Sequence, residues 1–273
     1  GLEGVRRDAG RAFGDATVYV EKFFSPAPRH IEIQILGDAH GHVTHLGERE
    51  CSLQRRFQKI VEETPSTAVS ADLRARMGVA AVALARHVGY QNAGTIECLV
   101  DDQGDFYFLE MNTRLQVEHP VTEEVTGVDL VREMVRIAAG LPMSVPEQGI
   151  APRGHAIELR IYAEDPAKAF MPSPGTISDM VVPEISHLRV DTGFRSGSKV
   201  TVYYDPMIAK LTAWGPDRDS AIATLRTALE NARIDGVKTN IAFLQRLLDR
   251  EDFLTGRIHT RYVDEQLASI MAD

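Results

Sequence analysis

The stretch Thr95-Ile-Glu-Cys-Leu-Val-Asp-Asp-Gln-Gly-Asp-Phe-Tyr-Phe-Leu-Glu-Met-Asn112 decides the fold, because it predicts a β-hairpin that carries acidic side chains. Apolar strands at 95–100 and 106–111 flank a tight turn over 102–105. With Gln103 and Gly104 as the loop residues, Glu97 lies directly opposite Glu110, and both carboxylates point to the same face of the hairpin.

The facing carboxylates predict a cation site. Like charges that face each other across a ladder are destabilising, so a bound cation is expected between them. Asn112 lies on the same face, two residues beyond Glu110. Two carboxylates and an amide oxygen suit magnesium with a nucleotide better than they suit zinc. The alternative is a pair of solvated glutamates on an exposed face, and the hairpin by itself leaves both interpretations open.

The segment after the hairpin carries a resemblance to a known family. Residues 110–123 read Glu-Met-Asn-Thr-Arg-Leu-Gln-Val-Glu-His-Pro-Val-Thr-Glu. This pattern resembles the signature of biotin carboxylases, a branch of the ATP-grasp enzymes. The Glu-x-Asn core is common to many ATP-grasp proteins, whereas the extension from Arg114 to Pro120 is more specific. Further stretches resemble the same family, and they are 19–24, 29–34, 48–59, 160–166, 172–175 and 204–210.

The resemblance implies an α+β fold in two units. The C-terminal part of an ATP-grasp domain is expected over 1–141, and a biotin carboxylase C-terminal α+β domain over 154–273. Prolines and glycines mark a linker at 142–153. Members of the family place an N-terminal domain, a glycine-rich lid and two phosphate-binding lysines ahead of these units. We find no such lid here, so we expect the C-terminal portion of a longer enzyme.

Periodicity and capping residues predict the elements. Helices are expected over 1–13, 71–88 with Ser70 as N-cap, Asp129 to Gly140, 218–233 and 240–249. Strands are expected near 17–24, 30–36, 43–49, 155–163, 186–191, 199–204 and 207–214. The charged segment 114–120 is interpreted as extended. Along 30–36 polar and isoleucine residues alternate, which predicts one polar and one apolar face.

The resemblance also implies an activity, namely ATP- and bicarbonate-dependent carboxylation of biotin through carboxyphosphate. This is the first half-reaction of a biotin-dependent acyl-CoA carboxylase. It requires Mg²⁺ or Mn²⁺, for which the family's ligands match Glu97, Glu110 and Asn112. Another ATP-grasp carboxylate ligase would explain these ligands but not Arg160 or the segment 116–120. A non-catalytic truncated fragment is a third possibility.

The remaining roles follow from the resemblance, residue by residue. Bicarbonate is held by the Arg114 fork, the Gln116 side chain and the Val117 backbone. Glu118 matches the general base and Lys59 the lysine that neutralises the anion, while Arg160 matches the cation that stabilises the biotin enolate. For Arg114 and Glu118 the alternative is a surface ion pair. The residues matched to nucleotide or biotin binding are Glu21, Lys22, Phe24, His30, Gln54, Gln58 and Asp205. Phe57 stands where many relatives have histidine, and no contact is assigned to it.

Composition limits the partners. The 273 residues are 44% hydrophobic and carry a net charge of −9, which disfavours nucleic acid and anionic membranes. No apolar run is long enough to span a bilayer, and no signal peptide is expected. Cys51 and Cys98 are interpreted as packing residues in a reducing compartment, either the bacterial cytoplasm or the mitochondrial matrix. The family implies a homodimer that works with a biotin carboxyl carrier domain and with a carboxyltransferase subunit.

Overall fold

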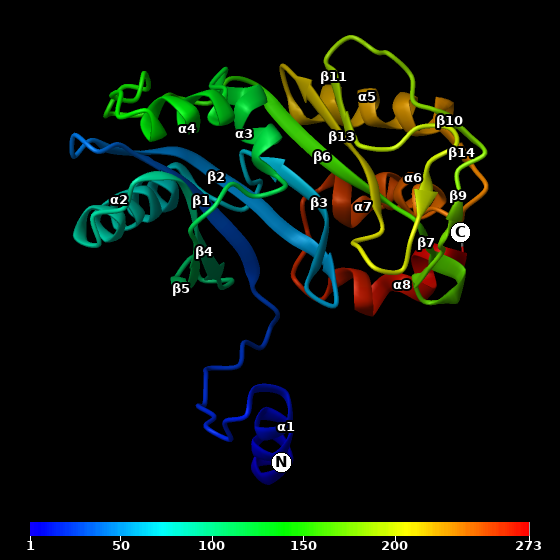
Figure 1. The fold of residues 1–273 in the computed structure, drawn as a ribbon, viewed down its shortest axis with the longest axis horizontal. Coiled ribbons are helices and arrows are strands. Elements are labelled where there is room, and N and C mark those ends of the chain that lie inside the picture. The colour runs from blue at the N-terminus through cyan, green and yellow to red at the C-terminus, as the bar shows by residue number, and fades with distance from the viewer. Residues whose placement is uncertain (273) are drawn as a thin grey trace.

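One eight-stranded sheet runs through the molecule in the order β11-β13-β6-β3-β2-β1-β4-β5, with every neighbouring pair antiparallel (Figure 1). This computed structural model describes residues 1–272, so the last residue of the predicted second domain lies outside the described residues. The strands of the sheet are β1 (Arg29–Gly37), β2 (Val43–Arg55), β3 (Gln58–Thr64), β4 (Asn92–Val100), β5 (Phe106–Asn112), β6 (His155–Tyr162), β11 (Leu188–Thr192) and β13 (Met207–Gly215).

Helices and short strand pairs surround this sheet. The helices are α1 (Leu2–Phe13), α2 (Ala71–His87), α3 (His119–Thr126), α4 (Leu130–Ala138), α5 (Arg218–Asn231), α6 (Ile241–Asp249), α7 (Glu251–Leu254) and α8 (Tyr262–Ala272), with a 3₁₀ turn at Pro166–Lys168. The short strands are β7 (Glu164–Asp165), β8 (Met171–Pro172), β9 (Gly175–Thr176), β10 (Asp179–Val181), β12 (Lys199–Val200) and β14 (Arg233–Asp235). Each of these helices is too short or too polar to span a bilayer within residues 1–272.

The two faces of β1 have different environments, as its alternating sequence predicts. Ile31, Ile33 and Ile35 pack into an apolar core with Leu73 and Met77 of α2. The Ser70 hydroxyl caps α2 by accepting a hydrogen bond from the Leu73 amide, which confirms the predicted helix start. The polar residues of the opposite face, which are His30, Glu32 and Gln34, are buried as well.

The hairpin pairs Glu97 with Glu110 and Thr95 with Asn112, which confirms the predicted register at the acidic residues. The predicted two-residue loop is wrong, because the connection spans 101–105 and Cys98 faces Phe108 near the turn. A β-bulge between Glu97 and Cys98 shifts the pairing by one residue. Since one residue of slip turns a side chain to the other face, the bulge is what brings the two carboxylates opposite each other.

Other predicted elements differ from the structure. The strand expected at 17–24 is absent, since no residue from 14 to 28 joins a ladder. The segment expected to extend after the hairpin turns at 114–118 and then forms α3, in which Pro120 occupies the first turn. The strand expected at 43–49 continues to Arg55 and returns as β3, and only Lys199 and Val200 of the strand expected at 199–204 are paired.

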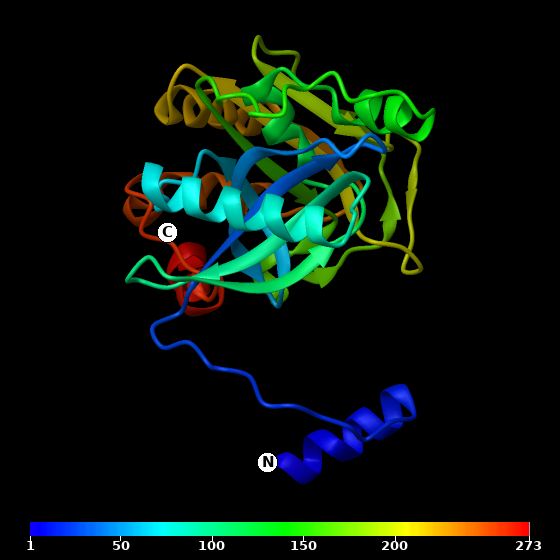
Figure 2. The same cartoon turned by 90° about the vertical axis from the view of Figure 1, so that its left-hand side faces the viewer.

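The sheet continues through both expected units, because β3 of the first unit pairs with β6 of the second. The largest apolar core lies around α5 and α6 and also takes Leu53 and Val61 from β2 and β3. At the other end, α1 lies apart from the body of the molecule and buries no residue (Figures 1 and 2). Cys51 and Cys98 are both buried and free, as expected for packing residues.

Candidate active site

The candidate residues inferred from the sequence all line one cleft of about 800 Å³. The cleft lies on the polar face of the sheet and takes side chains from β1, β2, β3, β4, β5 and β6 and from the segment before α3. The candidate residues in its wall are Glu21, Lys22, Phe24, His30, Gln54, Gln58, Lys59, Glu97, Glu110, Asn112, Arg114, Gln116, Val117, Glu118, Arg160 and Asp205.

A row of four charged residues runs across the sheet, and its last two members line this cleft. Arg49 on β2 is opposite Glu32 on β1, Glu32 is opposite Glu97 on β4, and Glu97 is opposite Glu110 on β5. Arg49 is fully buried and donates to Glu32, Gln34, Thr95, Gln116 and Thr122. Because three carboxylates stand side by side, the row needs further positive charge besides Arg49.

Lys59 supplies part of that charge. Its Nζ lies 2.7 Å from Glu32 Oε2, 3.4 Å from Glu97 Oε1 and 2.5 Å from Glu118 Oε1. Burial by itself lowers the pKa of Lys59, but the acidic groups around it raise that pKa well above the ordinary value. Lys59 therefore stays charged, and it links the acidic residues of the row to Glu118, which precedes α3.

Burial also acts on Glu32 and Glu97, two of the three acidic residues that Lys59 contacts. Burial by itself raises the pKa of Glu97. The contact with His30, whose Nε2 lies 2.7 Å from Glu97 Oε2, and the charge of Lys59 outweigh burial and lower that pKa to about 2. For Glu32, the charges of Arg49 and Lys59 likewise outweigh burial and lower the pKa to about 2. Both carboxyls are therefore ionised at neutral pH.

The end of the row has the donor set of a hard divalent cation. The Asn112 amide donates to Glu97 Oε1 at 2.9 Å and to Glu110 Oε1 at 3.1 Å, so it lies between the two carboxylates. Turning this amide over exchanges its nitrogen for its oxygen and gives three oxygen ligands around one point. Glu110 is exposed, which leaves room for phosphate oxygens and water. These residues fit a magnesium or manganese ion.

A second chain of contacts joins Glu118 to β6. Arg160 Nη2 lies 3.0 Å from Glu118 Oε2 and 2.5 Å from Glu62 Oε1. The Lys210 ammonium donates to the Val117 carbonyl at 2.6 Å. Gln116 is fixed between Arg49 and Glu97, at 3.0 and 2.6 Å. The segment 116–118 is therefore held by cations and hydrogen bonds from the sheet.

The cleft mouth is aromatic on one side. The Lys22 ammonium lies 4.6 Å from the Tyr107 ring centre and 5.1 Å from that of Phe24, and the two rings stand edge to face. Arg114 is exposed, and its guanidinium donates to Asn112 Oδ1 and to the Leu115 carbonyl rather than to Glu118. Arg114 and Glu118 do not form the surface ion pair that was the alternative interpretation.

Sequence reasoning missed several residues of the site. It gave no role to Glu32 or Arg49, although their positions on β1 and β2 would have placed them opposite each other once the strand register was known. It also missed Thr260 and Arg261, which come from far along the chain. The Thr260 amide donates to the Pro28 carbonyl, and Arg261 lies over the Phe23 ring. No local signal marks these two residues.

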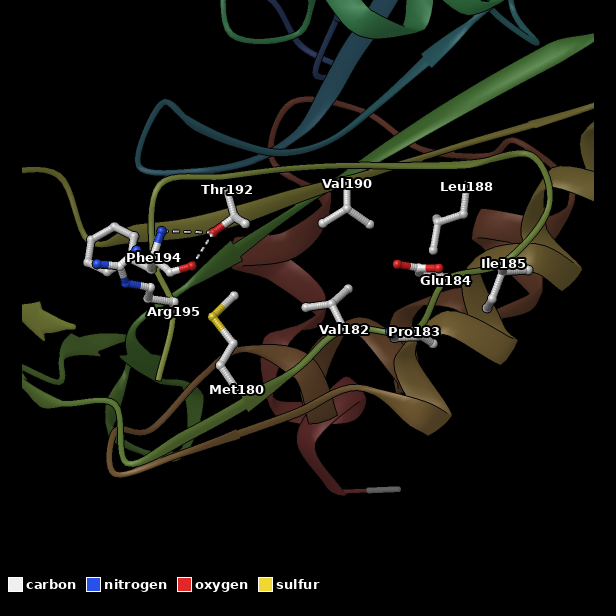
Figure 3. Close-up of a pocket in the computed structure, with 10 residues that line it drawn as sticks. All are labelled: Met180, Val182, Pro183, Glu184, Ile185, Leu188, Val190, Thr192, Phe194 and Arg195. Atoms are coloured by element: carbon white, nitrogen blue, oxygen red, sulfur yellow. Dashed lines mark hydrogen bonds between the residues drawn. The ribbon is translucent and has the colours of Figure 1, made fainter. Parts of the chain in front are cut away.

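Another cavity, of about 430 Å³, lies beside β11 and has a mainly apolar wall (Figure 3). The Thr192 hydroxyl already forms hydrogen bonds within the wall of this cavity, with the backbone of Phe194. Glu184 and Arg195 are its charged residues. Because this wall brings together no cluster of acids and bases, the larger cleft is the better candidate for catalysis.

Chemically, the cleft suits reactions of phosphates and small anions. Carboxylate and amide oxygens face one end, where a divalent cation would neutralise phosphate charge. At the other end, Glu118 is held between Lys59 and Arg160. A carboxylate held in this way can accept a proton from a bound substrate while the cations stabilise negative charge that develops nearby.

Comparison with protein families divides the chain into two matched parts. Residues 2–145 match the model for the carbamoyl-phosphate synthase L chain, ATP binding domain. Residues 158–265 match the model for the biotin carboxylase C-terminal domain.

Individual relatives agree with these matches. The chain is 52% identical to a biotin carboxylase of Nostoc sp., over 94% of this chain and 58% of that protein. It is 50% identical to biotin carboxylase 2 of Bacillus subtilis, over 97% of this chain and 59% of that protein. The biotin carboxylase domain of Hydrogenobacter thermophilus 2-oxoglutarate carboxylase, solved with MgADP and bicarbonate, superposes with a TM-score of 0.94. That structure is 45% identical, and the match covers 98% of this chain and 59% of that one. The chain thus spans little more than half the length of these relatives.

Proposed function

Because the chain belongs to the biotin carboxylase family of ATP-grasp enzymes, we propose that it supplies most of the active site for ATP- and bicarbonate-dependent carboxylation of biotin. The reaction would proceed through carboxyphosphate and form the first half-reaction of a biotin-dependent carboxylase. The observation that carries the proposal is the single cleft in which Lys59, Glu118 and Arg160 form one continuous chain of ion pairs beside the acidic row.

The metal end of the cleft would bind magnesium or manganese through Glu97, Glu110 and Asn112. Such an ion supplies charge neutralisation for the phosphates of ATP. Glu21, Lys22, Phe24, His30, Gln54 and Gln58 line the nucleotide side, where the Lys22 and Phe24 contacts with Tyr107 fix the wall. Glu32 and Arg49 are positioning residues, because they hold Lys59 and Gln116 without facing the open cleft.

The bicarbonate end would use the segment from Arg114 to Glu118. The exposed Arg114 fork suits a planar anion, and Gln116 and the Val117 backbone would hold its other oxygens. Glu118 would accept the bicarbonate proton as general base, while Lys59 offsets the charge of the anion. Arg160 would then stabilise the negative charge that forms on the ureido oxygen of biotin, beside Asp205 in the same wall.

The partners follow from this reaction. A carrier domain must bring biotin to the cleft, a carboxyltransferase subunit must accept the carboxyl group, and a homodimer is expected. We place the protein in the bacterial cytoplasm or the mitochondrial matrix. We also propose the domain division 1–141, 142–153 and 154–273. It is supported by the separate apolar cores around α2 and α5, although the α5 core also takes Leu53 and Val61 from the first unit.

The test is ATP hydrolysis that requires bicarbonate and increases with free biotin. It is measured for residues 1–273 alone and for the same residues fused to the N-terminal region of the Nostoc relative. We expect activity in the fusion and its loss in Glu118→Gln. ATP hydrolysis that does not depend on bicarbonate would favour another ATP-grasp ligase. A folded fusion that binds MgADP but hydrolyses no ATP would favour a non-catalytic chain.

A further inference from the structure

Two buried carboxyl groups face each other directly behind the cleft. Glu62 on β3 and Glu158 on β6 are partners in the antiparallel ladder that joins the two parts of the sheet (Figure 1). Both side chains are fully buried, at 0% exposure. Partners in a ladder project to the same face, so two acidic groups are brought together away from water.

The cations around this pair do not neutralise it completely. The charged groups that face the pair, or share its cations, are Arg160 on β6, Lys59 on β3, Glu118 before α3, Lys210 on β13 and Asp191 on β11. Arg160 is divided between Glu62 and Glu118, and Lys59 is divided among three other carboxylates. Lys210 lies 3.6 Å from Glu158 and also bonds to the Val117 carbonyl.

Each member of the pair has an unused oxygen. Thr212 donates to Glu158 Oε2 at 2.9 Å, but Glu158 Oε1 accepts no hydrogen bond within residues 1–272. Glu62 Oε1 keeps its ion-pair contact with Arg160, and Glu62 Oε2 likewise accepts no hydrogen bond from these residues. A buried carboxylate oxygen without a donor is costly, whereas a proton retained by the pair would relieve both the repulsion and the missing bond.

We propose that Glu62 and Glu158 retain one proton between them at neutral pH, and that this singly charged pair positions Arg160 and Lys210 behind Glu118. The electrostatics agree with the geometry. Burial and then the charge of Glu62 raise the pKa of Glu158 to about 8, although Lys210 and Arg160 oppose the shift. Burial also raises the pKa of Glu62, against the charge of Arg160. The proton belongs to the pair rather than to one residue.

The pair acts on the site through the two cations. Arg160 links Glu62 to the carboxylate of Glu118, and Lys210 links Glu158 to the neighbouring Val117 carbonyl. Loss of the retained proton at alkaline pH would add a negative charge to the pair. That charge would draw Arg160 and Lys210 away from the segment 117–118. Glu62 and Glu158 are therefore positioning residues, and their part in catalysis rests on the function proposed above.

The proton is tested without any activity, by infrared difference spectroscopy of the carbonyl stretch of un-ionised carboxyl groups. In the parent chain at pH 7 we expect one such group that disappears in Glu158→Gln, with an alkaline midpoint that Glu62→Gln moves to lower pH. Glu230→Gln, at an exposed position of α5, is the matched control and should change nothing. An unaltered signal in Glu158→Gln overturns the proposal. Should that variant fail to fold, the absence of any alkaline-titrating carboxyl in the parent would overturn it equally.

The positioning role is tested by pH profiles of biotin-dependent ATP hydrolysis in the active fusion. Glu158→Gln imitates the protonated acid, so it should keep kcat at pH 7 and lose the decline at alkaline pH. Glu158→Ala removes the anchor of Lys210 and should lower kcat by roughly 10- to 100-fold, with the KM for ATP unchanged. An alkaline decline that persists in Glu158→Gln overturns the positioning role. A parent without activity would instead refute the proposed function and leave the infrared result standing.

Discussion

Glu32 and Glu97 lie directly opposite each other on β1 and β4, although both are buried carboxylates that remain ionised. This pairing is tolerated because Arg49 contacts Glu32 at 2.6 Å and Lys59 contacts both residues. Glu32 and Glu97 are thus held by shared cations, so removal of one member leaves its neighbours unpaired.

Substitution Lys59→Gln should therefore affect both stability and activity. It leaves Glu32, Glu97 and Glu118 without their shared cation, and breaking a buried ion pair costs about 3–5 kcal/mol of unfolding free energy. Bicarbonate-dependent ATP hydrolysis should disappear as well. Urea unfolding followed by circular dichroism gives the stability. Lys199→Gln at an exposed position is the control, and equal unfolding midpoints for the two variants would refute the expectation.

Stability should also fall in acid. The folded pKa values of Glu32 and Glu97, about 2, lie below the ordinary value of 4.5. Their contribution to stability is therefore fully present above about pH 4.5 and is lost as the pH falls towards 2. We expect a loss on the order of 1–3 kcal/mol over that interval. Glu32→Gln should be less stable than the parent at pH 6 and show a shallower acid loss, measured by urea unfolding at each pH. A parallel acid loss in parent and variant would contradict this explanation.

The site was easier to predict than the fold around it, because the residues of a chemical motif can be read without knowing their neighbours. Strand alternation with a two-residue loop predicts that Glu97 faces Glu110. The structure has the same pairing, but it arises from a longer turn and a β-bulge that no residue type in the hairpin predicts. A correct local pattern can therefore be produced by a different turn.

Most of the structural features that could not be predicted from the sequence depend on pairing between strands that are far apart in the chain. Val18 and Val20 favour a strand, yet no strand within residues 1–272 pairs with their segment. The pairing of β3 with β6 joins residues that are far apart in the sequence, and the meeting of Glu62 and Glu158 depends on it. The start of α3 was a missed local signal, since proline in a first helical turn is common and Pro120 occupies that position.

The turn between β2 and β3 offers a test of backbone strain. Arg56 and Phe57 both have positive φ angles, of 48° and 66°, although neither is glycine, and the Phe57 ring is 93% exposed. Asparagine tolerates this conformation, whereas a β-branched residue does not. We expect Phe57→Asn to raise the unfolding free energy by about 0.5 kcal/mol and Phe57→Val to lower it by about 1 kcal/mol.

Calorimetric Tm values measure this difference, and the two variants control for each other because both remove the exposed ring. A Tm for the asparagine variant at or below that of the valine variant would refute the expectation that the positive φ angle at position 57 limits stability. The result bears on function because Phe57 lines the cleft beside Gln58.

The two carboxylates of the metal end should differ in what their removal does. Glu110 is exposed and accepts one hydrogen bond from Asn112, whereas Glu97 is buried and is contacted by His30, Lys59, Asn112 and Gln116. Glu110→Gln should therefore weaken magnesium-dependent ADP binding by roughly tenfold or more and leave stability within about 0.5 kcal/mol. Glu97→Gln should weaken binding and also lower the unfolding free energy by about 1–3 kcal/mol, because His30 and Lys59 lose their partner.

Titration calorimetry with ADP, with and without magnesium, separates the two effects when it is combined with thermal unfolding. Asp102→Asn, at the exposed turn of the same hairpin, is the matched control and should change neither quantity. If Glu110→Gln binds MgADP as tightly as the parent, the ion is held elsewhere. The facing carboxylates would then be explained without an ion, because Lys59 already offsets the charge of Glu97 and His30 contacts it.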